Sequence, residues 1–128
     1  MFKAKYCGVK IALKEIFIPD NKQERHEVLQ DFDKELRVLS CLRHPRIITF
    51  YGSVRSKPHY CLLTELMSGS VSSLLKLVRT RKARVTWGIL FQVSKDTAEA
   101  CVYLHGLNPK ILHRDLKAEN ILIDEDFR

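Results

Sequence analysis

The stretch "ILHRDLKAENILID", residues 111–124, sets charged and polar side chains between two apolar doublets. An aspartate flanked by basic residues, with an amide five positions further on, can accept a proton while neighbouring groups hold anionic oxygens. A solvated, charged turn is the alternative interpretation, and composition alone favours it. The polar residues of the stretch are His113, Arg114, Asp115, Lys117, Glu119 and Asn120.

A long helix is predicted directly before this stretch, over residues 86–105. Its apolar residues recur at helical spacing, Thr86 can cap its start, and "GLNP" ends it. A shorter helix is predicted over residues 70–80, and "NILID" predicts a short strand at the end of the stretch. The predicted buried side of the long helix comprises Trp87, Leu90, Phe91, Ser94, Ala98, Cys101, Val102 and Leu104.

The N-terminal half predicts a small sheet. Residues 9–16, "VKIALKEI", alternate with the period of a half-buried strand. The stretch "HPRIITFYGSV" predicts a turn and a strand, "SKP" a hairpin turn, and "HYCLLTEL" a mostly buried strand. A sheet-rich part joined near residues 65–70 to a helical part indicates the α+β class.

A second long helix is predicted over residues 21–42. Asn21 and Glu24 are spaced as a capping box. Glu35 lies on the same side of this helix as the apolar residues, and an inward carboxylate is costly to bury unless a cation meets it. The helix therefore requires a cationic partner. The apolar residues of that side are Val28, Leu29, Phe32, Leu36, Leu39 and Leu42.

The spacing H-R-D-L-K-x-x-N is matched in full by "HRDLKAEN", and it is typical of a protein kinase catalytic loop. The sequence resembles the eukaryotic protein kinase family over essentially all 128 residues, and "IALK" is similar to the family's V-A-I-K strand. The resemblance implies an α+β, two-lobed kinase fold. Residues 1–66 would form the small antiparallel-sheet lobe with one long helix, and residues 67–128 the start of the helical lobe.

The resemblance also implies a catalytic set and the cofactors ATP and Mg2+. Lys14 would hold the α and β phosphates of ATP and pair with Glu35, which supplies the cation that the helix requires. Asp115 would accept the hydroxyl proton of a protein substrate, and Asn120 would bind magnesium. Lys117 would neutralise charge on the transferred phosphate. A lysine there is similar to serine/threonine and tyrosine-kinase-like enzymes, including mixed-lineage and Raf-type kinases, so the expected substrate hydroxyl is Ser or Thr.

The adenine site is implied in the same way. Thr64 would guard the back of the pocket, while Glu65 and Met67 would offer backbone groups to the adenine edge. Ala12 and Leu122 would enclose the ring. Taken alone, Thr64 is better explained as an ordinary strand threonine and Leu122 as a core leucine, and only their register with the stronger motifs supports the adenine site.

Two residues of the loop have two interpretations each. Glu119 would either contact the ribose or be a solvated acid. In many members of the family the residue at Arg114 binds a phosphate on the activation loop. A salt bridge within the helical lobe is the alternative for Arg114.

Parts of the family pattern are not found in the sequence. The N-terminal "MFKAKYCG" resembles only the end of the hairpin that carries the Gly-rich loop. The pair Asp126-Phe127 follows Asn120 too closely to be the D-F-G motif, and Asp124 to Asp126 predict a hairpin turn. We therefore expect an incomplete domain that is inactive by itself.

An incomplete domain would leave the apolar side of residues 86–105 exposed, and such a patch favours aggregation or a partner. This is the basis of an alternative hypothesis, in which the chain is a non-catalytic, kinase-like module that binds a kinase or a scaffold.

Charge gives little support to a nucleic-acid binder. The formal net charge is +7, but the 22 basic and 15 acidic residues are interspersed. Only "RTRKAR", residues 79–84, concentrates basic charge, and it contains no aromatic side chain that could stack on a base. A solvated helix end or loop is the favoured interpretation.

Cysteine and hydropathy patterns predict a protein of the cytoplasm or the nucleus, and of the two we expect the cytoplasm. The cysteines are irregularly spaced without a CxxC pair, which predicts reduced, buried thiols, and the histidines lack metal-ligand spacing such as HExxH. The lysine-bearing N-terminus is not typical of a signal peptide. No apolar run approaches the length of a membrane span. The cysteines are Cys7, Cys41, Cys61 and Cys101.

Overall fold

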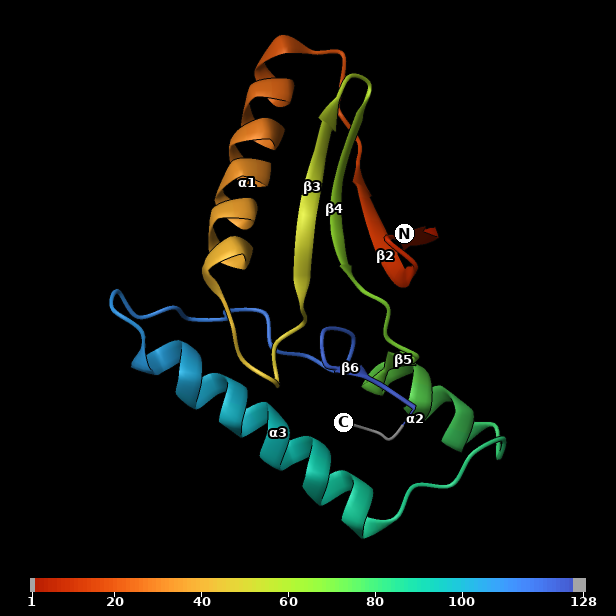
Figure 1. The fold of residues 1–128 in the computed structure, drawn as a ribbon. Helices are drawn as coiled ribbons and strands as arrows, with labels where there is room; N and C mark the ends of the chain where they lie inside the picture. The colour runs from red at the N-terminus through yellow and green to blue at the C-terminus, as the bar shows by residue number, and fades with distance from the viewer. Residues whose placement is uncertain (1, 126–128) are drawn as a thin grey trace. The chain divides into compact units, whose positions relative to one another are not determined.

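A four-stranded antiparallel sheet forms the first part of the computed structural model, which describes residues 2–125 (Figure 1). The strand order is β1-β2-β4-β3, so β2 and β4 are the inner strands. The β1–β2 hairpin closes at Tyr6 and Val9 through Cys7 and Gly8, whose φ angles of 48° and 82° suit the two-residue turn of a twisted hairpin. The strands are β1 (Phe2–Tyr6), β2 (Val9–Ile16), β3 (Phe50–Ser56) and β4 (His59–Glu65).

The centre of this sheet is buried as the strand predictions require. Ile11 and Leu62 are 2% and 1% exposed. Ala12 alternates with Lys10 and Lys14 along β2, yet it is buried because its small side chain lies between the longer cross-strand neighbours Lys3 and Thr64. Conversely, several apolar strand residues remain exposed next to turns and at edges, namely Phe2, Tyr6, Val9, Tyr51 and Val54.

Helix α1 (Lys22–Cys41) lies alongside β3 (Figure 1). Asn21 caps it as predicted, because its side chain accepts a hydrogen bond of 2.9 Å from the Gln23 amide. Glu24 accepts a 3.4 Å bond from the side-chain amide of Asn21. Phe32 is the buried residue of the predicted apolar side, whose other members are half-buried.

The remaining elements belong to a second compact unit, since the chain divides into Met1–Leu66 and Met67–Arg128. Ser70 caps α2 through a capping box with Ser73, and Thr86 caps α3 as predicted. The predicted turn around Asp126 extends beyond the described residues. The elements are β5 (Gly69–Ser70), α2 (Val71–Arg79), α3 (Trp87–Gly106) and β6 (Leu122–Ile123), and β5 pairs antiparallel with β6.

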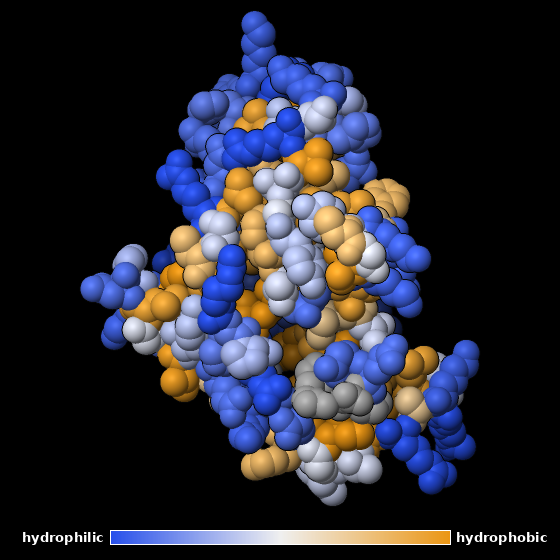
Figure 2. Space-filling view, in the orientation of Figure 1, coloured by the Kyte–Doolittle hydropathy of each residue, from blue (hydrophilic) through white to orange (hydrophobic). Residues whose placement is uncertain are grey.

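Most residues on the side of α3 that helical spacing predicts to be buried are exposed, so the structure bears out the other expectation for this helix, an uncovered apolar side. Trp87, Phe91 and Val102 are 87%, 71% and 73% exposed. Hydrophobic surface is visible in Figure 2 in the part of the view that α3 occupies in Figure 1. Leu104 is buried as predicted, where the Ile111 amide donates a 3.0 Å bond to its carbonyl. Helical spacing identifies an apolar side, but only a packing neighbour can bury it.

The prediction of buried thiols is also wrong in part. All four cysteines are free, but Cys7 and Cys41 are exposed because they lie in the β1–β2 turn and at the end of α1. Cys61 is less exposed, and burial, with a smaller effect of the Glu15 charge, raises its pKa. Within residues 2–125, none of the helices combines the length and the apolar character needed to cross a membrane.

Candidate active site

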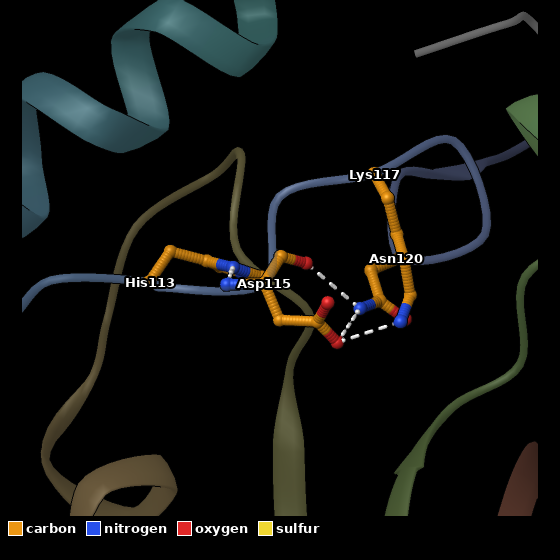
Figure 3. Close-up of polar contacts among 4 residues, drawn as sticks. All are labelled: His113, Asp115, Lys117 and Asn120. Atoms are coloured by element: carbon orange, nitrogen blue, oxygen red, sulfur yellow. Dashed lines mark hydrogen bonds and ion pairs between the residues drawn. The ribbon is translucent and has the colours of Figure 1, made fainter.

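The loop that follows α3 gathers three of the predicted catalytic residues around one carboxylate (Figure 3). Asp115 Oδ2 accepts a 2.8 Å bond from Asn120 Nδ2 and lies 2.9 Å from Lys117 Nζ. The side-chain Nδ2 of Asn120 also donates a 2.9 Å hydrogen bond to the backbone carbonyl of Asp115. The backbone N–H of Asn120 donates a 2.9 Å hydrogen bond to the backbone carbonyl of Lys117. The turn thus holds the carboxylate, ammonium and amide groups in one place.

The charges in this cluster favour an ionised Asp115. The hydrogen bond from Lys117 lowers the pKa of Asp115, with a further contribution from Asn120, and the same contact raises the pKa of Lys117. Both side chains are solvent-accessible. At neutral pH the carboxylate is therefore a hydrogen-bond acceptor, able to orient a hydroxyl group and receive its proton as bond formation acidifies it.

Replacing Lys117 by Ala is expected to raise the pKa of Asp115 toward its ordinary value, because the principal cause of its depression is removed. In the intact chain the pair stabilises the fold above the unfolded-state pKa of Asp115, and that contribution is lost as pH falls through the lower folded-state pKa. Carboxyl 13C shifts measured against pH would show the change.

The matched control is Lys110→Ala, which removes an exposed lysine preceding the same loop. It should leave the titration of Asp115 nearly unchanged. Equal titration curves for the Lys117 and Lys110 variants would contradict the assigned cause.

Glu35 on α1 has the cationic partner that the sequence predicts for it. Lys14 Nζ on β2 lies 2.7 Å from Glu35 Oε1. The side chains are 47% and 38% exposed, so both keep part of their hydration. The desolvation penalty of this ion pair is therefore smaller than that of the buried pair that the sequence suggested. Its direct contribution to the free energy of unfolding is modest.

The predicted adenine-contacting residues of the first unit lie around the end of β4. Ala12 and Thr64 are direct cross-strand partners. The Thr64 hydroxyl donates a 3.2 Å bond to the Glu65 carbonyl. Glu65 and Thr49 exchange two further bonds, because the Glu65 amide donates to the Thr49 carbonyl at 2.9 Å and the Thr49 amide to Glu65 Oε1 at 2.5 Å. Thr49 had no signal in the sequence pattern.

The predicted nucleotide-contacting residues of the second unit lie near the start of α2. Glu119 Oε1 accepts a 3.2 Å bond from the Ser72 hydroxyl, and the Ser72 amide donates to the Ala118 carbonyl at 2.9 Å. Leu122 is 38% exposed and pairs with Ser70, while Met67 is half-buried. Ser72, which joins the loop to α2, was not found by sequence reasoning.

The oxygen atoms of the Asp115 cluster have the chemistry that Mg2+ requires. Carboxylate and carboxamide oxygens are hard ligands of the kind that this ion prefers. Asn120 Nδ2 donates hydrogen bonds to Asp115, so the side-chain amide of Asn120 is held in one orientation and its Oδ1 atom points away from these bonds. Over residues 2–125, no group of three or more His, Cys, Asp or Glu side chains forms a separate metal site.

A Lys–Glu pair linking a strand to one long helix, and a loop that joins Asp, Lys and Asn, define the class of protein kinase domains. Residues 2–128 match the family described as "Protein kinase domain". The chain belongs to this family, and its fold is the α+β fold of a kinase domain in part.

Curated relatives are similar over most of the chain. A probable serine/threonine-protein kinase of Dictyostelium discoideum, drkB, is 38% identical over 101 residues, which are 79% of this chain and 14% of that protein. Another, drkD, is 33% identical over 128 residues, 100% of this chain and 10% of that protein. The probable serine/threonine-protein kinase SIS8 of Arabidopsis thaliana is 31% identical over 127 residues, 99% of this chain and 12% of that protein. The chain therefore spans a small part of the length of these relatives.

Proposed function

We propose that the chain is part of a serine/threonine protein kinase that transfers the γ-phosphoryl group of ATP to protein Ser or Thr hydroxyls. The main support for this function is the Asp115 cluster, in which Lys117 forms an ion pair with the Asp115 carboxylate and Asn120 donates a hydrogen bond to it. Asp115 orients the substrate hydroxyl and accepts its proton, and Lys117 offsets charge on the transferred phosphate. Asn120 holds Mg2+, which would neutralise phosphate charge when bound. The names of the relatives support Ser and Thr as acceptors.

The proposal extends to the nucleotide. Lys14 binds the α and β phosphates and is oriented by Glu35. Thr64 lies at the back of the adenine pocket, and the remaining contacts come from Ala12, Glu65, Met67, Glu119 and Leu122. In this assignment residues 1–66 belong to the N-terminal lobe, and residues 67–128 belong to the first part of the C-terminal lobe.

Two finer assignments are part of the same proposal. The lysine at position 117 favours the tyrosine-kinase-like group, with mixed-lineage and Raf-type kinases as the nearest resemblance. The four free thiols favour a reducing compartment, and we place the protein in the cytoplasm.

A second candidate function rests on the exposed apolar residues of α3. Trp87, Phe91 and Val102 are each more than two-thirds exposed. A helix face of this kind suits a protein partner. In this alternative the chain is a non-catalytic module that binds a kinase or a scaffold through α3, and its Asp115 cluster plays no role in catalysis.

Titration of the purified chain with ATP, with and without Mg2+, tests the proposed function. We expect saturable, Mg2+-dependent binding that Lys14→Met weakens about ten- to a hundredfold, the effect of losing a charged hydrogen bond. Lys10→Met is the matched control, because Lys10 is an exposed lysine of the same strand. Isothermal titration calorimetry would measure all three proteins.

The result separates the two candidates. Equal binding by the two lysine variants, or no binding by a folded monomer, would contradict the ATP site as assigned. A non-binding chain that forms a complex of fixed stoichiometry with a kinase or scaffold would favour the second candidate.

A further inference from the structure

Phe32 is the buried contact of α1, and two strand residues surround its ring. The guanidinium carbon of Arg55 lies 5.3 Å from the ring centroid. The Tyr60 ring meets Phe32 edge-on, with centroids 5.8 Å apart and an interplanar angle of 88°. Arg55 and Tyr60 are direct cross-strand partners of β3 and β4, so the sheet presents them together. Both contacts are of kinds that stabilise beyond simple burial.

Arg55 also contacts the residue that follows Phe32. Its Nη2 forms an ion pair with Asp33 Oδ1. One side chain on β3 therefore binds two consecutive residues of α1, one through the ring face and one through a carboxylate. Arginine suits both contacts, because its planar guanidinium can stack on a ring and donate to a carboxylate at once.

The positions of Asp33 and Glu35 on the helix give this contact a consequence. Successive helical residues are turned by about 100°, which places Asp33 on one side of Phe32 and Glu35 on the other. The sheet holds both sides, because Arg55 binds Asp33 and Lys14 binds Glu35. If α1 rotated about its own axis, both ion pairs would be disturbed. The Phe32 contact by itself would not prevent this rotation, because the helix could turn about the Phe32 ring.

We propose that Arg55 is a positioning residue, which fixes the rotation of α1 and so keeps Glu35 opposite Lys14. Its importance for catalysis rests on the proposed function, but its effect on the Lys14–Glu35 pair does not. The Arg55 and Asp33 side chains are 49% and 42% exposed, so the effect of this ion pair is modest rather than absolute.

NMR on the whole chain can test the positioning directly. The readout is the nuclear Overhauser contact between the ε-methylene of Lys14 and the γ-methylene of Glu35, whose charged atoms lie 2.7 Å apart. Arg55→Met keeps an apolar stem over Phe32 and removes the charge, and Asp33→Asn removes the same ion pair from the helix side. We expect the contact to weaken in both variants by a similar amount, about two- to fivefold in population, while both remain folded.

The control breaks a different ion pair on the same helix. Asp31→Asn removes the partner of Lys34, which lies 2.9 Å away, and both side chains are more than 70% exposed. This control should keep the Lys14–Glu35 contact. The charge-swapped pair Arg55→Asp with Asp33→Arg should restore it, a rescue that loss of packing would not give.

The NMR contact between Lys14 and Glu35 decides whether Arg55 positions α1. A Lys14–Glu35 contact of undiminished intensity in Asp33→Asn would overturn the proposal. This variant remains informative even if Arg55→Met fails to fold, because Asp33 is partly exposed. If the chain binds ATP, the same two variants should weaken binding about two- to fivefold, the effect of one exposed ion pair. If it binds none, the proposed function fails while the NMR contact still decides the role of Arg55.

Discussion

Replacing Asp115 by Asn, in a kinase domain that contains this chain, is expected to lower the rate of phosphoryl transfer about 100- to 10,000-fold. The amide has nearly the shape of the carboxylate but cannot accept a proton from the substrate hydroxyl. It also loses the negative charge that pairs with Lys117 at 2.9 Å. Initial rates at saturating ATP, measured on a protein substrate with labelled γ-phosphate, would quantify the loss.

The matched control for this variant is Glu125→Gln, which neutralises an exposed acid in the residues that follow β6. Its rate should stay near that of the unaltered protein. The Asp115 variant should still bind ATP, since it removes no predicted adenine contact. Undiminished transfer by Asp115→Asn would contradict the role assigned to this carboxylate, whereas an unaltered domain that transfers no phosphate would favour the non-catalytic alternative.

Replacing Leu62 by Ala is expected to lower the free energy of unfolding of the first unit by about 2–5 kcal/mol, the usual cost of a leucine cavity. Leu62 is 1% exposed on the inner strand β4, with Lys14 and Ser53 as its cross-strand partners. A large loss is expected because neighbours on both sides limit how far the sheet can close around the cavity. Urea unfolding followed by circular dichroism would measure it.

Val54→Ala is the comparison, because Val54 lies on the edge strand β3 and is 40% exposed. Its effect should stay within about 0.5 kcal/mol, as for most surface substitutions. Equal unfolding midpoints for the Leu62 and Val54 variants would show that the centre of the sheet is not the stabilising core that its burial indicates.

The elements that sequence patterns predicted well are those whose signals are local. The caps at Asn21 and Thr86 depend on hydrogen bonds to amides two or three residues away, and both form as expected. The period of two in residues 9–16 predicted β2, since neighbouring side chains alternate between the faces of a strand. The α+β class followed from the order of these elements.

Some contacts of the candidate site left no such signal. The Glu65–Thr49 and Glu119–Ser72 hydrogen bonds join residues that are 16 and 47 positions apart. The ion pair of Arg55 with Asp33 joins strand and helix across 22 positions. Thr, Ser and Arg are common on protein surfaces, so their types alone do not indicate partners that distant in the chain.

By itself, the sequence determined the helices α1, α2 and α3, the strands β2, β3, β4 and β6, and the requirement for a cation opposite Glu35. The spacing of "HRDLKAEN" and "IALK" determined the resemblance to protein kinases. Only the tertiary structure decided which apolar surfaces are covered: helical spacing identified the apolar side of α3 without deciding whether it is covered, and most of that side is exposed. It also showed that Lys14 and Glu35 meet while still partly hydrated. The physical reason is that periodicity is a local property of the chain, whereas burial depends on which distant segments pack against it.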